Sequence, residues 1–359
     1  MSSRLKIIRN TFFVSLSLAA LLLAWPTAGI AAPVLEQIQK ITATPPGKDA
    51  AFGYAMAISG DTMVVGAWHD PSGALLHVGA AFVFVRFNGK WIQEAKLTAP
   101  DGVASDEFGC SVAISGHTIV VGARHADITV GGVNKQDAGA AYVFVRARGT
   151  KVGNFPWSFQ QKLEATAPPG VNIANDEFGH SVAVSGNVAV VGAHHADVAG
   201  YSEAGALYTF SRSALTWTEQ QRLTPSGAWG GGDHLGASVA ISGNKIAAGA
   251  NGDQTPVGDA GAVYVFKDNG SGAYVVEQKL TVPPGTNGDF QKMGGSIGFD
   301  GNTIVAGAPE YTAVVGHNAY GAAYVFEFDG ANWGQPKKLT ASDGAKTDRF
   351  GWSVAVSHN

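Results

Sequence analysis

The sequence FGCSVAISGHTIVVGA, residues 108–123, decides the fold. It contains two short runs in which apolar side chains alternate with small or polar ones, and Gly116 followed by His117-Thr118 separates them. Alternation with a period of two is typical of β-strands, and a Gly-containing break between two such runs is typical of a hairpin. A third run, GAAYVFV at 139–145, follows after a loop, and a fourth run such as WIQEAKLT at 91–98 or WGQPKKLT at 333–340 ends the unit. The stretch therefore predicts four short antiparallel strands.

The same unit recurs along the chain at intervals of roughly 57 residues, apart from one longer interval. The units start at Phe52-Gly53, Phe108-Gly109, Phe178-Gly179, Leu235-Gly236, Met293-Gly294 and, incompletely, Phe350-Gly351. Four short strands repeated at a regular period are the signature of propeller blades, whereas a β-helix repeat is shorter and a β-sandwich has no reason to recur. The sequence predicts an all-β propeller with five complete four-stranded blades and a partial sixth, in one domain spanning 32–359.

Composition excludes several classes of protein. The 359 residues include 24 Lys or Arg and 28 Asp or Glu, a net charge of −4, so a nucleic-acid binder built on a basic patch is not expected. The single cysteine, Cys110, cannot form a disulfide within the chain, and we expect it to be a small buried residue. The 48 glycines are roughly twice the usual share, which indicates many tight turns or close backbone approaches.

The N-terminal segment has the layout of a secretory signal peptide. Three basic residues, Arg4, Lys6 and Arg9, precede an apolar run at 11–25, and small residues follow. The sequence predicts cleavage after Ala31, or after Ala32 as the alternative, and no membrane span afterwards. The mature protein is therefore expected to be secreted, periplasmic or attached to the cell surface.

The unit resembles a known repeat. Phe-Gly at its start, Val-Val-Gly-Ala before a loop and Gly-Ala-Ala-Tyr-Val-Phe in the third run are similar to the FG-GAP repeat of integrin α-subunit heads and of many exported bacterial propellers, over residues 37–359. Members of that family include adhesion receptors, lectins and proteins with no assigned role, so the resemblance implies a propeller fold more strongly than one function.

In integrin-like propellers the N-terminal stretch supplies the outermost strand of the last blade, and EQIQKITA at 36–43 matches the fourth run of the units. The run at 351–357 supplies only a first strand, so the last blade lacks its two middle strands. Three explanations compete: truncation of a longer propeller, which we favour, a six-bladed ring with one thin blade, or closure by dimerisation.

The long loops predict the binding face. Loops joining strands four to one and strands two to three lie at the same end of a propeller, and both classes are long here, whereas strands one and two are joined by two-residue hairpins. Integrin-like blades that bind Ca²⁺ carry an extended Asp-rich loop between strands one and two, which these hairpins cannot replace. The sequence therefore predicts no cofactor, and calcium would have to bind outside these turns.

Four aspartates lie two residues before a unit start: Asp106, Asp176, Asp233 and Asp348. We interpret them as acceptors for backbone N–H groups in the loops rather than as an acidic ring. Four tryptophans recur at the start of the fourth run: Trp91, Trp157, Trp217 and Trp333. Recurrence at one structural position favours packing between blades over ligand stacking.

Three histidines occupy the same place in successive two–three loops: His69, His125 and His195. Zinc needs ligand atoms at about 2.0 to 2.2 Å, and equivalent positions on separate blades are normally too far apart for one ion. His194 is adjacent to His195, but two residues do not make a metal site, and Gly252 and Glu310 replace the histidine in later units. We therefore interpret these histidines as hydrogen-bonded loop anchors and predict no metal site.

Trp68 and Trp229 depart from the tryptophan repeat and fall in loops of the expected binding face. The residues predicted to contact a ligand are Trp68, His69, Arg124, His125, His194, His195 and Trp229. No nucleophile elbow, zinc-protease motif or phosphate loop occurs in its required context, so the sequence predicts that the chain is not an enzyme. The expected function is an adhesion-type binding scaffold for a protein or surface ligand. A glycan-binding lectin and an accessory domain of a longer protein are the alternatives.

Overall fold

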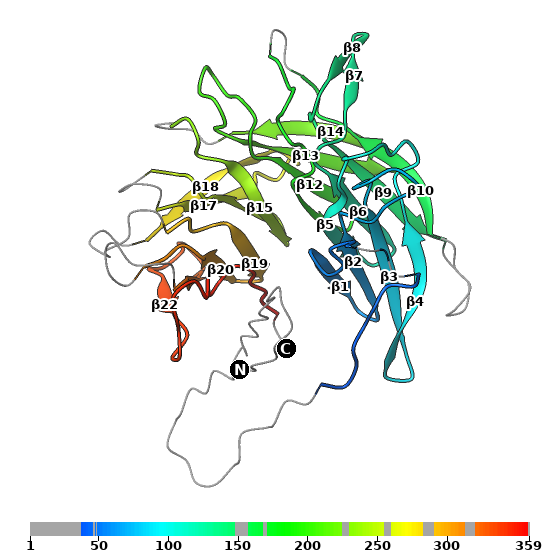
Figure 1. The fold of residues 1–359 in the computed structure, drawn as a ribbon. Coiled ribbons are helices and arrows are strands. Elements are labelled where there is room, and N and C mark those ends of the chain that lie inside the picture. Colours follow the sequence, from blue (N-terminus) through cyan, green and yellow to red (C-terminus); the bar gives the residue numbers. More distant parts are fainter. Residues whose placement is uncertain are drawn as a thin grey trace.

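The computed structural model describes residues 37–45, 47, 49–147, 157–167, 171–224, 230–254, 260–282, 291–312 and 320–357. Five four-stranded antiparallel sheets follow one another around a ring (Figure 1), so the prediction of an all-β propeller is confirmed. The predicted signal peptide at 1–31 and the candidate ligand residue Trp229 lie outside the described residues. Within them, no helix has the length and apolar character needed to cross a membrane.

The first blade consists of β1 (Met56–Ser59), β2 (Thr62–Ala67), β3 (Ala80–Phe87) and β4 (Lys90–Leu97). The second consists of β5 (Phe108–Ser115), β6 (Thr118–Ala123), β9 (Ala140–Arg146) and β10 (Trp157–Leu163). The third consists of β11 (Ser181–Ser185), β12 (Val188–Ala193), β13 (Ala206–Ser213) and β14 (Thr216–Leu223). The fourth consists of β15 (Leu235–Ser242), β16 (Lys245–Ala250), β17 (Ala262–Asp268) and β18 (Tyr274–Thr281). The fifth consists of β19 (Ser296–Asp300), β20 (Thr303–Ala308), β21 (Ala322–Glu327) and β22 (Lys337–Leu339).

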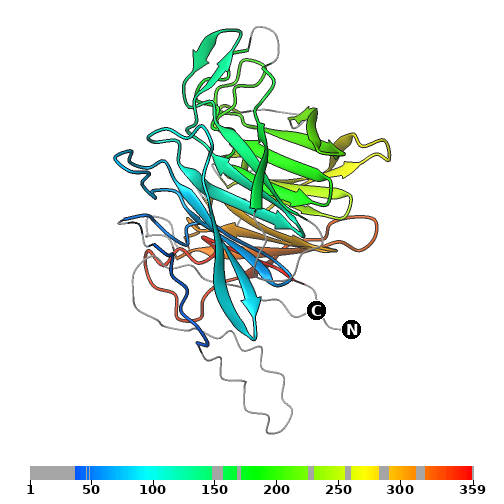
Figure 2. The same cartoon turned by 90° about the vertical axis from the view of Figure 1, so that its right-hand side faces the viewer.

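Each blade is a meander in which consecutive strands pair, with the first strand in the middle of the ring and the fourth at its rim (Figure 1). The loop between the second and third strands of the second blade forms a hairpin of β7 (Ile128–Val130) and β8 (Val133–Lys135). From Ala123 to Gly139 this loop spans 16 positions, against 12 from Ala67 to Gly79 in the first blade, so it accounts for only part of the one long repeat interval. The hairpin stands out from the ring (Figure 2), and the sequence did not predict it. Its Ile128 is buried against Ile173 and Ala138, so it is anchored by a small core of its own.

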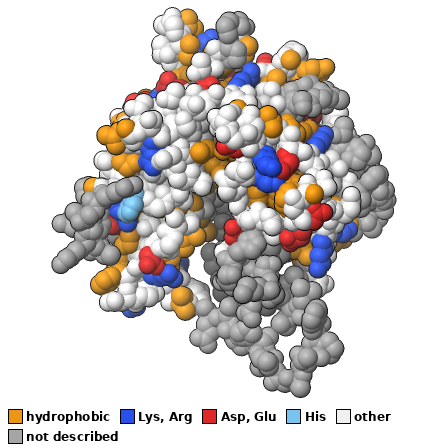
Figure 3. All heavy atoms as spheres, turned by 180° about the vertical axis from the view of Figure 1, so that it is seen from behind, with side chains coloured by type: hydrophobic (Ala, Val, Ile, Leu, Met, Phe, Trp, Pro, Cys, Tyr) orange, Lys and Arg blue, Asp and Glu red, His pale blue; other side chains and the backbone are white. Residues whose placement is uncertain are grey.

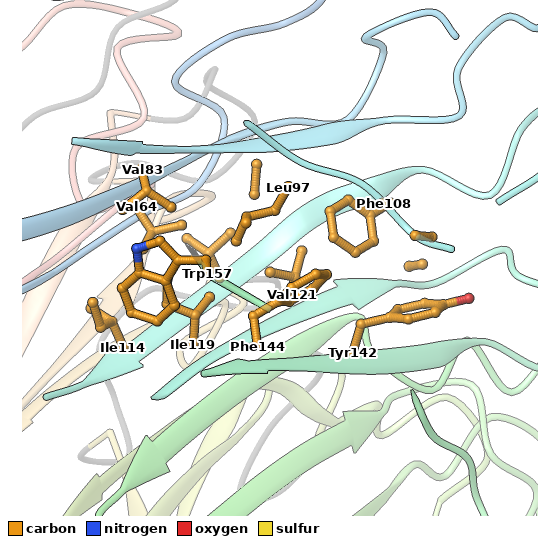
Figure 4. Packing of buried hydrophobic residues seen from close by; sticks show 14 of the residues in the cluster. Val64, Val83, Leu97, Phe108, Ile114, Ile119, Val121, Tyr142, Phe144 and Trp157 are labelled. Atoms are coloured by element: carbon orange, nitrogen blue, oxygen red, sulfur yellow. The ribbon is translucent and has the colours of Figure 1, made fainter. Parts of the chain in front are cut away.

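The main core lies between neighbouring blades. Figure 4 shows one such layer, in which residues of the first blade pack on residues of the second: Val64, Val83 and Leu97 against Phe108, Ile119, Val121 and Trp157. Fully burying a side chain of this size contributes about 1.5 to 3 kcal/mol. Blades with a neighbour on either side bury both sheet faces, which fits the nearly continuous apolar runs of their second strands, such as β6.

Polar contacts join the blades at the rim. The Gln161 side chain donates to the carbonyl of Trp217 (2.7 Å) and accepts from its N–H (2.8 Å), and the Trp217 indole is buried. The same reciprocal pair recurs between Gln221 and Tyr274, Gln278 and Trp333, and Gln39 and Trp91. These contacts support the interpretation of the recurring tryptophans as packing residues. They also place residue 39 where the fourth strand of a preceding blade would lie.

Several details differ from the sequence-based prediction. The partial sixth blade is not formed: 37–43 and 351–357 contain no strand, because a first and a fourth strand are never paired directly with each other in the other blades. In the hairpins between first and second strands, the two turn residues start at the glycine, as in Gly116-His117, since Thr118 already belongs to β6. Strand β22 has only three residues, because Pro336 has no N–H for the ladder.

The view from behind shows basic and acidic side chains interspersed with hydrophobic ones, without a patch of one sign on that side (Figure 3). Cys110 is buried and unpaired, as the sequence predicts. Its Sγ lies 3.6 Å from the carbonyl oxygen of Gly179 in the next blade. The thiol therefore belongs to the contact between the second and third blades.

Candidate functional site

One end of the ring carries the loops that precede each first strand and those between second and third strands; we call it the loop face. Each blade presents three sets of side chains there. In the third blade they are Glu177, immediately before Phe178-Gly179, then His180, immediately after that pair, and finally His194 and His195, which follow β12.

The residue before the Phe-Gly pair has a fixed, unusual backbone. Glu177 has a φ of 54°, in the left-handed region that side chains other than glycine seldom adopt. Its N–H donates to the carbonyl of Asp137 (3.2 Å), and the next N–H, of Phe178, donates to the carbonyl of Ala138 (2.9 Å). Phe178 is fully buried. The equivalent residues also have positive φ values: Ala51, Glu107, His234, Lys292 and Arg349. The fold therefore imposes this conformation at every blade junction.

The Glu177 carboxylate meets four imidazoles. Its Oε1 lies 3.3 Å from Nδ1 of His195 and 3.5 Å from Nε2 of His125. Its Oε2 lies 3.5 Å from Nδ1 of His180 and 3.9 Å from Nδ1 of His194. Side chains of the second and third blades thus converge on one carboxylate.

The imidazoles also lie against one another. The ring centroids of His180 and His194 are 3.7 Å apart, and those of His194 and His195 are 3.9 Å apart. His234 of the fourth blade adds a ring 5.3 Å from that of His195, and its Nδ1 lies 3.4 Å from the carbonyl oxygen of His194. We call Glu177, His180, His194, His195 and His234 the His–Glu cluster.

Burial and charge set the protonation of this group. Burial by itself would raise the pKa of Glu177, but the contacts with His125 and His180 hold it well below the usual range of a glutamate. Contacts with Glu107 first and Glu177 second raise the pKa of His125 to about 9. Burial lowers the pKa of His180 and of His194. The site therefore combines an ionised carboxylate with two neutral imidazoles, the protonation states in which these groups bind cations.

A line of contacts continues to the first blade. Glu107 pairs with Arg124 at 2.7 Å, and the Arg124 guanidinium lies over the Trp68 ring at 5.5 Å. The Trp68 and His69 ring centroids are 3.5 Å apart, and His69 stacks on His77 at 4.1 Å. The structure thus connects six of the seven residues that the sequence singled out, and Trp229 is outside the described part of the chain.

The sequence-based search missed the residues that join these groups: Glu107, Glu177, His180 and His234. It considered the aspartates two residues before each unit start but not the residue immediately before it. Three of the four aspartates behave as expected in the loops: Asp106, Asp233 and Asp348 accept N–H groups of Val103, Gly230 and Ala345 at 2.8 to 3.0 Å. Asp176 differs, because its Oδ2 is buried without a hydrogen-bond partner among the described residues.

Two overlapping groups have ligand-type atoms within 4.8 Å of one another: Glu177 with His180 and His194, and His194 with His195 and His234. The sequence predicted no metal site because equivalent positions on separate blades are too far apart. That reason does not apply to this cluster, because its members come from non-equivalent positions of adjoining loops. A carboxylate and imidazoles are a ligand set that suits zinc and similar ions.

Comparison with known proteins gives no match among curated proteins. Among solved structures, the chain is similar to one titled a putative 6-phosphogluconolactonase from Bacteroides uniformis ATCC 8492. The identity is 11%, the TM-score is 0.49, and the match covers 82% of this chain and 74% of that one. This finding corrects the prediction that the chain is not an enzyme: a protein with an enzyme's name is among the matches, so the lack of a familiar motif does not exclude catalysis. A likeness this distant carries no activity over to this chain.

A family model of the FG-GAP repeat matches five stretches: residues 35–84, 91–144, 157–210, 217–266 and 333–359. Three of these, 91–144, 157–210 and 217–266, begin in a fourth strand and end in the third strand of the next blade. They therefore include the blade junction at which Phe-Gly is buried. Together the five stretches cover more than half of the sequence, and this chain belongs to the FG-GAP repeat family.

Proposed function

We propose that the protein is an exported binding scaffold that holds a protein or a surface-attached ligand on its loop face. The FG-GAP propeller fold fits a binding scaffold in general. The long loops of this face, mounted on rigid blades, are the usual place for binding residues on such a fold.

The observation that carries the proposal is a contrast between two sets of residues at the blade junctions, the buried ones and those that follow the Phe-Gly pair. The buried residues of each junction repeat almost unchanged from blade to blade. The residues immediately after the Phe-Gly pair, by contrast, differ in every unit: Tyr54, Cys110, His180, Ala237, Gly295 and Trp352. Cys110 and Ala237 are buried, but Tyr54 and Trp352 are exposed, so these positions give the loop face side chains that do not repeat with the symmetry of the ring.

Two of these positions offer exposed aromatic rings. Trp352 is 53% exposed and Tyr54 is 38% exposed. Trp68, which the sequence favoured, is half-buried, with Tyr54, His69 and Arg124 against its ring. The Trp352 ring lies under the Arg349 guanidinium but stays more exposed. Exposed Trp and Tyr rings are the side chains that most often dominate binding energy at protein interfaces. We therefore assign the main contact to Tyr54 and Trp352 rather than to Trp68.

The test compares three single variants in a search for ligands. Labelled protein is applied to a glycan array and, in parallel, cross-linked to extracellular proteins in the presence of excess free sugar. Tyr54→Ala and Trp352→Ala should each weaken capture by about tenfold or more, the usual effect of removing a central aromatic residue. Phe87→Ala is the matched control, because Phe87 is 50% exposed but lies at the end of β3, beside the turn to β4 at the opposite end of the ring. Equal loss in all three variants would contradict the assignment.

The second candidate is binding of carbohydrate, which the same two exposed rings favour because aromatic faces stack on sugars. Saturable binding on the array that free sugar competes away would establish it. Capture of a protein that persists in excess sugar would instead support a protein ligand.

A further inference from the structure

We propose that Glu177, His180 and His194 bind a zinc ion, through one carboxylate oxygen and two imidazole nitrogens. The site goes beyond the proposed function, because binding of the ion does not depend on the protein or surface ligand proposed for the loop face. Its three residues come from one blade junction and from the loop that follows β12.

The spacing of the ligand atoms fits a tetrahedral ion. Bonds of about 2.0 to 2.1 Å in a tetrahedron separate neighbouring ligand atoms by roughly 3.3 Å. Oε2 of Glu177 lies 3.5 Å from Nδ1 of His180 and 3.9 Å from Nδ1 of His194. One ligand atom from each of the three residues lies within 4.8 Å of the other two, so small side-chain rotations close the site.

The two nitrogens approach the Glu177 carboxylate without reaching normal hydrogen-bond geometry. Nδ1 of His180 and Nδ1 of His194 are both buried, and neither forms a hydrogen bond with the described residues. A buried polar atom without a partner destabilises the fold. Two buried imidazole nitrogens that face the same carboxylate oxygen and have no hydrogen-bond partner form the arrangement expected of a metal site without its ion.

The surroundings provide the outer contacts that zinc ligands usually have. Oε1 of Glu177, the oxygen not used for the ion, lies 3.3 Å from His195 and 3.5 Å from His125, which fixes the orientation of the carboxylate. His195 and His234 form a second group with His194, so two more imidazoles lie next to the three proposed ligands.

The ligand types select the class of ion. Imidazole nitrogens with one carboxylate suit zinc and neighbouring first-row divalent ions. Ca²⁺ and Mg²⁺ take six or more oxygens, which the His–Glu cluster does not offer. Binding should therefore be specific for Zn²⁺ or Co²⁺ over Ca²⁺.

The test titrates purified, chelator-treated protein with Zn²⁺ by calorimetry and follows Co²⁺ by its visible absorption. The wild-type protein should bind one ion per chain, excess Ca²⁺ should not compete, and Zn²⁺ should raise the melting temperature. His194→Gln and Glu177→Gln should each weaken binding at least tenfold and abolish the thermal shift. Because Glu177 sits at a strained backbone position, circular dichroism of each variant without metal shows whether it is folded, and a variant that is not folded is replaced by His180→Gln.

The control is His117→Ala. His117 is exposed in the turn between β5 and β6, at the opposite end of the blade, so its loss should leave binding unchanged. The proposal is overturned if the wild type binds no stoichiometric Zn²⁺, or if folded ligand variants bind it as tightly as His117→Ala does.

Discussion

The glycine in the second strand of each blade should be intolerant of any side chain, and Gly122→Ala tests this most directly. A Cβ on Gly122 would lie 1.9 Å from the carbonyl oxygen of Gly179 and 2.3 Å from Oγ of Ser111. Real Cβ atoms essentially never approach other atoms closer than 3.0 Å, so the next blade would have to move. The glycine of Val-Val-Gly-Ala thus makes room for the Phe-Gly pair of the following unit.

The magnitude follows from two effects. Overpacking of a tightly packed interior costs about 1 to 3 kcal/mol. The displaced carbonyl of Gly179 also accepts a hydrogen bond from the Ser111 hydroxyl at 2.7 Å, and losing a buried bond of this kind costs about 1 kcal/mol more. We expect Gly122→Ala to lower the free energy of unfolding by about 3 kcal/mol, the sum of a mid-range overpacking cost and this bond.

Urea denaturation followed by tryptophan fluorescence measures the effect, with Gly116→Ala as the control. Gly116 has a φ of 55°, but a Cβ there would meet no atom within 4 Å. Its substitution should cost only about 1 kcal/mol, through the left-handed backbone alone. If Gly122→Ala unfolds at the same urea concentration as Gly116→Ala or the wild type, close approach between blades is not what requires the glycine.

Two further predictions concern a contact between blades and a carboxyl group in a loop. Gln161→Ala removes both hydrogen bonds to the Trp217 backbone and should lower the free energy of unfolding by about 2 kcal/mol. Gln220→Ala is the control and should change it little, because the exposed Gln220 amide donates only to a carbonyl of its own strand. The urea midpoints of the two variants measure the difference. Burial raises the pKa of Asp106 to about 6, above its value in the unfolded chain. Protonation of this carboxyl therefore favours the folded state, and this stabilisation is lost as the pH rises from about 4 through 6. Asp106→Asn should therefore gain up to about 3 kcal/mol relative to the wild type between pH 4 and 7, and a difference that stays constant with pH would contradict this.

The fold could be predicted because its signals are local. Alternation along 111–115 and 118–123, with a glycine turn between them, needs no long-range information to indicate a hairpin. Strand β7 contains only three residues within a loop, which is too short for a pattern to be recognised. Strand β22 was predicted too long because the tryptophan and lysines of its run match the other units, although Pro336 interrupts pairing.

The candidate site could be predicted only in part. His125 and His195 were found because they recur at equivalent positions, and recurrence is visible in the sequence. Glu177 and His180 were missed because their contacts depend on the left-handed backbone before Phe178, and a glutamate gives no sign that it adopts this conformation. Repetition along a sequence identifies equivalent residues, whereas a site at a blade junction is built from non-equivalent ones.

Gly252 shows how one departure from the repeat shapes the cluster. The sequence suggests that replacing the histidine of earlier blades by this glycine weakens any ring-shaped site. In the structure, a Cβ on Gly252 would lie 1.9 Å from the carbonyl oxygen of Gly232 and 2.9 Å from Cδ2 of His234. The missing side chain is therefore what leaves room for His234 to reach the rings of His194 and His195. The cluster spans the third and fourth blades because the fourth blade lacks this histidine.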